Sequence, residues 1–211
     1  MTPAQAPPRS RTVLFGLLAA LAALAFFAWL ADEVIHGRTQ PFDDRIRMLV
    51  HARSSPALTA AMRAVSLIGE PWFLFVLGVP AVVWFVWKGW RRTVFVFAIT
   101  VAGAEVIDQV LKLMFHRPRP ATFFSLAEPM GYSFPSGHAL VSCAFFGGLA
   151  VFAASRTGSR ARRCLYYIVA ALLIAAIGYS RIYLGAHYPS DVVGGYAAAV
   201  VWLFSVAWVR R

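Results

Sequence analysis

Three short polar clusters interrupt a sequence that is otherwise strongly apolar. Their side chains are cations, imidazoles, hydroxyls and one carboxylate, which are groups suited to binding and transferring phosphate. In chain order the clusters are Lys112–Pro120, Tyr132–His138 and Ser180–Asp191. Each cluster adjoins a long apolar stretch, so the sequence predicts that helix ends carry this chemistry.

The first capacity of these clusters is anion binding. Arg119 and Arg181 each offer a planar guanidinium that can donate two parallel hydrogen bonds to phosphate oxygens, and Lys112 adds a third positive charge. Ser136 and Gly137 follow a proline and precede an apolar run, which is typical of a helix start with free backbone N–H groups. We therefore expect these five residues to bind phosphate.

The second capacity is nucleophilic and acid–base catalysis. His138 and His187 are of the residue type best suited to such work near neutral pH. Asp191 follows His187 by four residues at a predicted helix start, so its carboxylate can accept from one imidazole nitrogen and leave the other to attack. No Cys/His or multi-carboxylate set with metal-ligand spacing accompanies them. We expect these three residues to be catalytic, with no metal and no cofactor, because the cations can stabilise a phosphoryl group themselves.

Four further polar residues adjoin the first cluster. Asp108 lies one helical turn before Lys112, and we expect it to position that lysine. Glu105 lies one turn deeper and is either a functional carboxylate or a neutral packing residue. His116 and Arg117 either contact substrate or lipid headgroups or belong to a solvated loop.

Together the three clusters resemble the signature motifs of the type 2 phosphatidic acid phosphatase superfamily. The family patterns K-x6-R-P, P-S-G-H and S-R-x5-H-x3-D are matched at every signature position by Lys112…Pro120, Pro135–His138 and Ser180…Asp191. The resemblance covers roughly residues 42–205. One such motif is weak support, whereas three in the family order are strong support.

The resemblance implies a role for each matched position. His187 would be the nucleophile that forms a phosphohistidine, Asp191 would orient it, and His138 would protonate the leaving oxygen. Water would then hydrolyse the intermediate without a metal. The residues that would hold the phosphate and stabilise its transition state are Lys112, Arg119, Ser136, Gly137 and Arg181.

The composition indicates a membrane protein. Of the 211 residues 60% are apolar and 14% are charged, whereas about 45–50% and about 25% are usual in soluble domains. This excludes a disordered chain and disfavours an ordinary soluble domain. The net charge of +11 could suggest nucleic-acid binding. Basic residues that flank membrane spans explain it better, so no nucleic-acid partner is expected.

Six apolar stretches approach the length of ~17–25 residues that a membrane-spanning helix needs. They are Thr12–Ala31, Pro71–Trp87, Thr93–Phe115, Gly137–Ser155, Cys164–Arg181 and Ser190–Val209. Apolar residues within Phe42–Ile68 recur at helical spacing, which predicts one or two amphipathic helices. These helices lie either on the membrane interface or against the protein's own loops.

The basic residues also predict an orientation. They concentrate in the N-terminus, in the loops after the second and fourth spans and in the C-terminus, which is typical of the cytoplasmic side. The three clusters then share the extracytoplasmic face. We expect a short disordered tail at residues 1–11 and a single domain at residues 12–211.

These observations lead to one expectation for the whole chain. It is an all-α, six-span bundle with an amphipathic interfacial segment, in the inner membrane of a bacterium with both termini cytoplasmic. The resemblance implies a lipid phosphatase, and among lipid substrates it favours undecaprenyl diphosphate. Phosphatidylglycerol phosphate, phosphatidate and phosphotransfer to a second lipid remain alternatives, and the oligomeric state is not predicted.

Overall fold

The computed structural model describes residues 9–124 and 130–209, and within these ranges every regular element is an α-helix. The predicted tail at residues 1–11 lies mostly outside the described residues, since the first helix begins at Arg9. The helices are α1 (Arg9–Ile35), α2 (Gln40–His51), α3 (Pro56–Ile68), α4 (Pro71–Trp87), α5 (Arg91–Phe115), α6 (Gly137–Ser155), α7 (Arg160–Tyr183) and α8 (Pro189–Val209).

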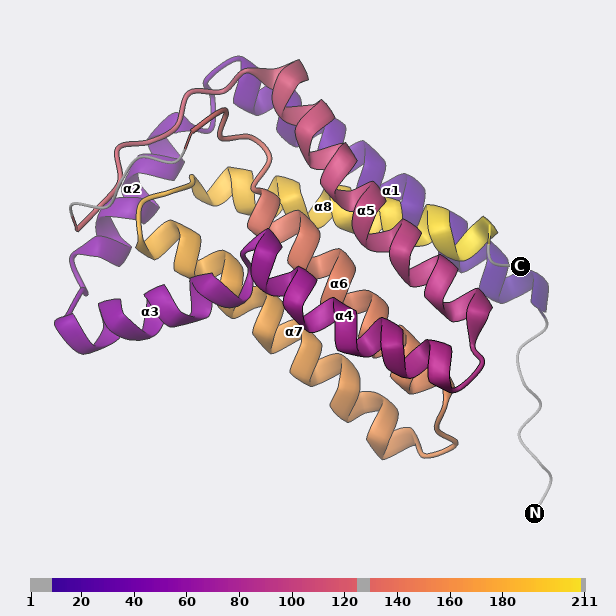
Figure 1. Ribbon diagram of the computed structural model, residues 1–211. Coiled ribbons are helices and arrows are strands. Elements are labelled where there is room, and N and C mark those ends of the chain that lie inside the picture. The colour runs from indigo at the N-terminus through magenta and orange to yellow at the C-terminus, as the bar shows by residue number, and fades with distance from the viewer. Residues whose placement is uncertain (1–8, 125–129, 210–211) are drawn as a thin grey trace.

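The long helices form the predicted multi-span membrane bundle (Figure 1). In the described ranges, five helices are long and apolar enough to cross a membrane, namely α1, α5, α6, α7 and α8. α4 has 17 residues and follows α3 with a bend of 55° between their axes, and the two together make a sixth candidate span. The predicted fold class is therefore confirmed, with five or six candidate spans.

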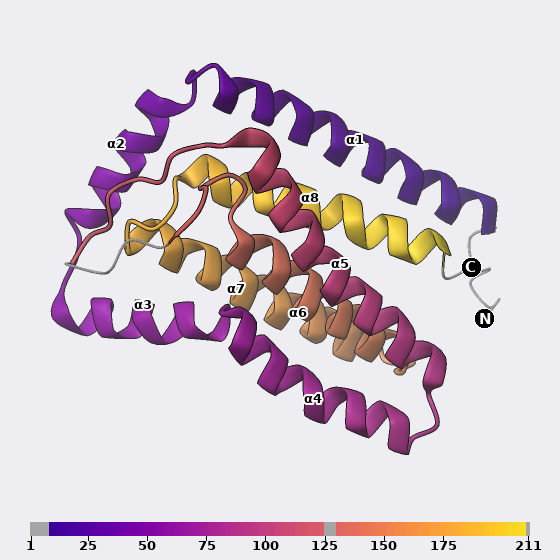
Figure 2. The same ribbon diagram turned by 45° about the horizontal axis from the view of Figure 1, so that its top comes forward.

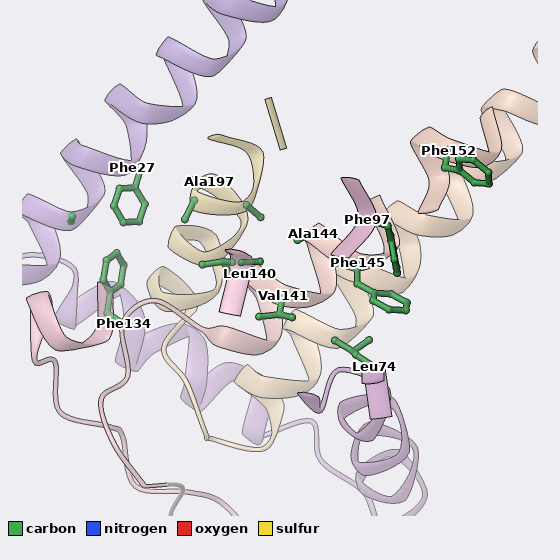
Figure 3. Packing of buried hydrophobic residues seen from close by; sticks show 14 of the residues in the cluster. Phe27, Leu74, Phe97, Phe134, Leu140, Val141, Ala144, Phe145, Phe152 and Ala197 are labelled. Atoms are coloured by element: carbon green, nitrogen blue, oxygen red, sulfur yellow. The ribbon is translucent and has the colours of Figure 1, made fainter. Parts of the chain in front are cut away.

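α6 lies at the centre of this bundle. Half of the most apolar 18-residue stretch of α6 is buried inside the protein, compared with 17% of the corresponding stretch of α1. Small residues such as Ala144, which is fully buried, let neighbouring helices approach closely. Phe97 packs against Phe145, and the same buried cluster extends along α6 from Leu140 to Phe152, as Figure 3 shows. This core fixes α6, whose first turn carries the second polar cluster.

α8 packs tightly against α6 at their starts. A Cβ atom at Gly195 would lie 2.6 Å from the carbonyl oxygen of Ser136 and 2.9 Å from the Cβ of Ala139, which is closer than real Cβ atoms come. The backbone N–H of Ser136 donates to the carbonyl oxygen of Asp191 over 2.9 Å. The second and third clusters are therefore held together by backbone contact.

The predicted amphipathic segment consists of α2 and α3, which connect the ends of α1 and α4 (Figure 2). Each begins with a proline in its first turn, and Ser55 caps α3 by accepting from the backbone N–H of Leu58. The buried residues of α2 are Asp43 and Arg47, whereas its apolar residues Phe42, Met48 and Leu49 are exposed. This helix thus turns a polar face to the protein.

Candidate active site

The three polar clusters meet at one end of the bundle. Lys112 lies in the last turn of α5, His138 in the first turn of α6, and Arg181 in the last turn of α7. His187 lies in the short connection between α7 and α8, and Asp191 lies in the first turn of α8. α2 and α3 flank this end (Figure 1).

His187 lies between a carboxylate and a guanidinium. Its Nδ1 is 3.4 Å from Asp191 Oδ2, and its Nε2 is 3.1 Å from Arg119 Nη1. A guanidinium can only donate, so Nε2 accepts and the proton of the neutral ring resides on Nδ1, facing Asp191. Burial lowers the pKa of His187 to about 3 against the opposing influence of Asp191. The ring is therefore neutral at pH 7, with the Nε2 lone pair directed at the cations.

Asp191 is fully buried and is held by several donors. Arg117 Nη1 lies 2.6 Å from its Oδ1, while the Ser133 hydroxyl and the backbone N–H of Tyr188 donate to its Oδ2 over 2.5 Å and 2.8 Å. These bonds fix the carboxylate that faces His187. Ser133 belongs to the second cluster, so the second and third clusters meet at this carboxylate.

Arg117 links the site to α2. Its Nη2 lies 2.8 Å from Asp43 Oδ2, and its guanidinium stacks 4.1 Å above the ring centroid of Tyr188. Asp43 also accepts from the backbone N–H of Ser190 over 2.9 Å. Burial acts to lower the pKa of Arg117, but Asp191 and Asp43 outweigh it and raise the pKa overall. Arg117 is thus an internal cation between two buried carboxylates, not part of a solvated loop.

The sequence offered a partial signal for this network. Arg117 lies two residues before Arg119, and a second arginine beside a phosphate-binding arginine could have been assigned a structural partner. No such signal marks Asp43, because an acidic residue near the start of an amphipathic helix usually faces solvent.

Lys112 is bound by the carboxylate predicted for it. Its Nζ donates to Asp108 Oδ2 over 2.6 Å, and Asp108 is buried. A Cβ atom at Gly137 would lie 2.8 Å from the same Oδ2, so only glycine fits there. Glu105 is half-buried and accepts from Gln109 over 3.3 Å. Asp108 therefore lies within the site, and Glu105 lies one turn away from it.

The predicted residues Arg181 and His138 contact the end of α3 and the start of α4. Arg181 Nη1 donates to the Ser66 hydroxyl on α3 over 2.5 Å, and His138 Nε2 lies 3.2 Å from Glu70 Oε1. Among the described residues, several buried polar atoms here lack a hydrogen-bond partner. They include Asp108 Oδ1, Ser136 Oγ and Arg181 Nε. Buried unpaired polar atoms of this kind are frequent where a polar ligand binds.

The arrangement can bind a phosphate and attack it. Lys112, Arg119 and Arg181 supply three positive charges, and the α6 N-terminus supplies backbone donors. His187 presents an oriented nucleophilic nitrogen, and His138 presents a second imidazole. Within residues 9–124 and 130–209, no three His, Cys, Asp or Glu side chains gather as metal ligands.

Comparison with known proteins finds relatives that are similar in sequence and in structure. The chain is 28% identical over 185 residues to phosphatidylglycerophosphatase B of Bacillus subtilis, which covers 86% of this chain and 89% of that protein. It is 28% identical over 116 residues to undecaprenyl-diphosphatase of Sulfolobus acidocaldarius, about half of each protein. The crystal structure of a transmembrane PAP2-type phosphatidylglycerolphosphate phosphatase from Bacillus subtilis matches with a TM-score of 0.82 and 25% identity. That match covers 90% of this chain and 95% of that one.

The sequence profile of the PAP2 superfamily matches residues 93–211, which is more than half of the chain and contains all three polar clusters. The predicted resemblance is confirmed by this match, and the chain belongs to the PAP2 superfamily.

Proposed function

We propose that this protein is a membrane lipid phosphatase that acts through a phosphohistidine at His187 and needs no metal. The observation that carries the proposal is the geometry of His187, with Asp191 on Nδ1 and Arg119 on Nε2. Arg119 is placed to hold a phosphate oxygen directly in front of the nucleophilic nitrogen. The family match and the similarity to proteins named as phosphatases support the same activity.

The reaction proceeds in two displacements. In the first, Nε2 of His187 forms a bond to phosphorus, the bond from phosphorus to the lipid oxygen breaks, and His138 gives its proton to that oxygen. In the second, water attacks the phosphohistidine, its proton passes to His138, and the phosphorus–nitrogen bond breaks. Lys112, Arg119 and Arg181 stabilise the charge on the equatorial oxygens in both transition states.

The membrane placement follows from the arrangement of charge. The start of α1 and the end of α8 lie at the same end of the bundle, away from the site (Figure 1). The loops at that end carry Lys88, Arg91 and Arg156, which favours the cytoplasmic side. The proposed site then faces the extracytoplasmic side of a bacterial inner membrane, in one domain formed by residues 12–211.

The proposal includes two candidate lipid substrates. We propose phosphatidylglycerol phosphate as the first candidate, which is supported by the name of the relative that matches 86% of the chain. Undecaprenyl diphosphate, which the sequence-based expectation favoured, is the substrate named for a relative that matches about half of the chain. The side chains described above are proposed to bind only the phosphate. They therefore do not distinguish the two substrates, which differ in their lipid portions.

The test is phosphate release by the detergent-purified protein in EDTA. The panel contains phosphatidylglycerol phosphate, undecaprenyl diphosphate, phosphatidate and a short soluble diphosphate. His187→Ala should abolish release, whereas His36→Ala, which changes an exposed histidine, should leave it unchanged. Vanadate, which mimics five-coordinate phosphorus, should inhibit. Strict dependence on a metal would overturn the mechanism. Release only after addition of an acceptor lipid would replace hydrolysis by phosphotransfer.

A further inference from the structure

The break between α3 and α4 faces the site. In the sequence it precedes the region that the family profile matches. Ser66, Gly69 and Glu70 lie at this break, whereas the match begins at residue 93. Ser66 accepts from the phosphate-binding Arg181 over 2.5 Å. The break therefore already supports one proposed site residue, and Glu70 is its only acidic side chain.

Glu70 contacts the imidazole of His138. Its Oε1 lies 3.2 Å from His138 Nε2, and the His138 side chain is 12% exposed. Gly69 lies against the same ring edge, because a Cβ atom there would lie 3.0 Å from His138 Cδ2. Cδ2 and Nε2 are adjacent in the ring, so this edge faces the break. Nδ1 lies on the opposite edge and is turned away from it.

The carboxylate of Glu70 is not used to cap a helix. Glu70 is the N-cap residue of α4, but its side chain makes no capping hydrogen bond. Its backbone is fixed separately, because its N–H donates to Leu67 and its carbonyl accepts from Leu74. The extended backbone at Glu70 and the following Pro71 direct the side chain toward α6. A capping role therefore does not explain the residue.

Apart from Glu70, the charged groups that act on His138 are cations. Lys112 on α5 and Arg181 on α7 both bring positive charge to the ring, and Asp108 is already paired with Lys112. An imidazole that must give a proton to a leaving group has to carry one at the start of the reaction. A carboxylate beside Nε2 favours the imidazolium and holds the ring in place.

We propose that Glu70 is a positioning residue for His138, which holds Nε2–H so that Nδ1–H can donate its proton to the leaving lipid oxygen. This inference rests on the proposed function, since it assigns the partner of the general acid. The proton that leaves Nδ1 goes to the lipid oxygen, and the neutral ring then accepts a proton from the attacking water.

The first experiment compares Glu70→Gln with the wild type on phosphatidylglycerol phosphate. The amide keeps the size of the side chain but loses its charge, so kcat should fall about 10- to 100-fold with KM nearly unchanged. The basic limb of the kcat profile should move to lower pH, because the imidazolium loses its carboxylate partner. Glu70→Asp, which keeps the charge, should retain more activity. Glu33→Gln, remote from the site, should behave as the wild type.

The second experiment separates a catalytic effect from a structural one through the leaving group. p-Nitrophenolate leaves without protonation, so the first-turnover burst of p-nitrophenol should survive in Glu70→Gln and in His138→Gln. With the lipid phosphate as substrate, the first-turnover release of the dephosphorylated lipid should be slow in both variants. Combining the two substitutions should slow it no further than His138→Gln alone.

Each other outcome overturns the inference. An unchanged pH profile in Glu70→Gln, equal losses on both substrates, or additive losses in the double variant would show that Glu70 does not act through His138. If Glu70→Gln does not fold, the same comparisons with Glu70→Ala, which also removes the charge, decide. Failure of the proposed function would look different, since the wild type itself would then release no phosphate.

Discussion

Arg117 is the single side chain on which the geometry around Asp191 depends most. It lies between two fully buried carboxylates, and its own side chain is 7% exposed. Removing one partner of a buried ion pair costs about 3–5 kcal/mol, because the other charge is left uncompensated. Arg117→Gln should therefore lower both thermal stability and phosphate release, the latter by 100-fold or more.

The control for that variant is Arg38→Gln. Arg38 pairs with Asp32 and Glu33 on the surface, where an ion pair contributes at most about 1 kcal/mol. Its effect on the melting temperature should be small. Adding Asp43→Asn to Arg117→Gln should recover part of the lost stability, since one unpaired charge disappears. No recovery, together with an unchanged melting temperature in Arg117→Gln, would contradict the assigned role.

His187 makes stability depend on pH. Its pKa is lowered by burial from an ordinary value of 6.5 to about 3, so the unfolded chain binds a proton between these values and the folded chain does not. Folding is therefore favoured fully above pH 6.5 and loses about 1.4 kcal/mol per pH unit below it. Thermal unfolding at pH 5 and pH 7.5 should show this loss. In His187→Gln the difference between the two melting temperatures should shrink, and an equal difference in both proteins would refute the assignment.

At the scale of elements, the contact between α6 and α8 aligns two clusters. A methyl group at Gly195 would press on the Ser136 carbonyl, whose residue is hydrogen-bonded through its N–H to Asp191. Gly195→Ala should therefore shift the α6 N-terminus away from the phosphate and lower kcat at least tenfold, as misplacement by even 1 Å is costly. Phosphate release at saturating substrate measures the effect.

Gly148→Ala provides the matched comparison within α6. Its new Cβ would lie 3.6 Å from Thr100 and 4.0 Å from Phe97, which is ordinary contact. Alanine is about 1 kcal/mol better than glycine inside a helix, so this variant should be as active as the wild type and no less stable. Equal losses in both variants would show that the α6 helix as a whole, not its start, is sensitive.

The same elements show what the sequence can and cannot predict. Hydropathy alone places α4 and α6 with the correct ends, because a continuous apolar run has few alternatives in a bilayer. The role of α2 is different. Its helical apolar pattern predicted an amphipathic helix on the membrane interface or against the protein's own loops. It did not predict that Asp43 and Arg47 are the buried residues, because only the tertiary fold brings carboxylate partners to Arg117. Contacts between residues 74 positions apart leave no periodic trace in the sequence.

For the whole molecule, the balance of charge between the two ends predicts the orientation in the membrane. Basic residues gather where α4 meets α5 and where α6 meets α7, at the end away from the site. They are Lys88, Arg91, Arg92, Arg156, Arg160, Arg162 and Arg163. The site end also carries arginines, but Arg117 is neutralised by buried carboxylates and so does not count as a free loop charge. The rule that positive loops stay cytoplasmic then predicts that the site lies on the extracytoplasmic side of the membrane.

This orientation can be measured with single cysteines in a variant in which Cys143 and Cys164 are replaced by serine. Met130, at the site end, is 95% exposed, and Gly158, at the other end, has open space around its backbone. Met130→Cys should react with a membrane-impermeant maleimide in intact spheroplasts. Gly158→Cys should react only after the membrane is permeabilised. Both variants must keep phosphatase activity, so that the labelling reports the native fold. The reverse labelling pattern would place the site on the cytoplasmic side, and a lipid phosphate of the cytoplasmic leaflet would then be the substrate to test.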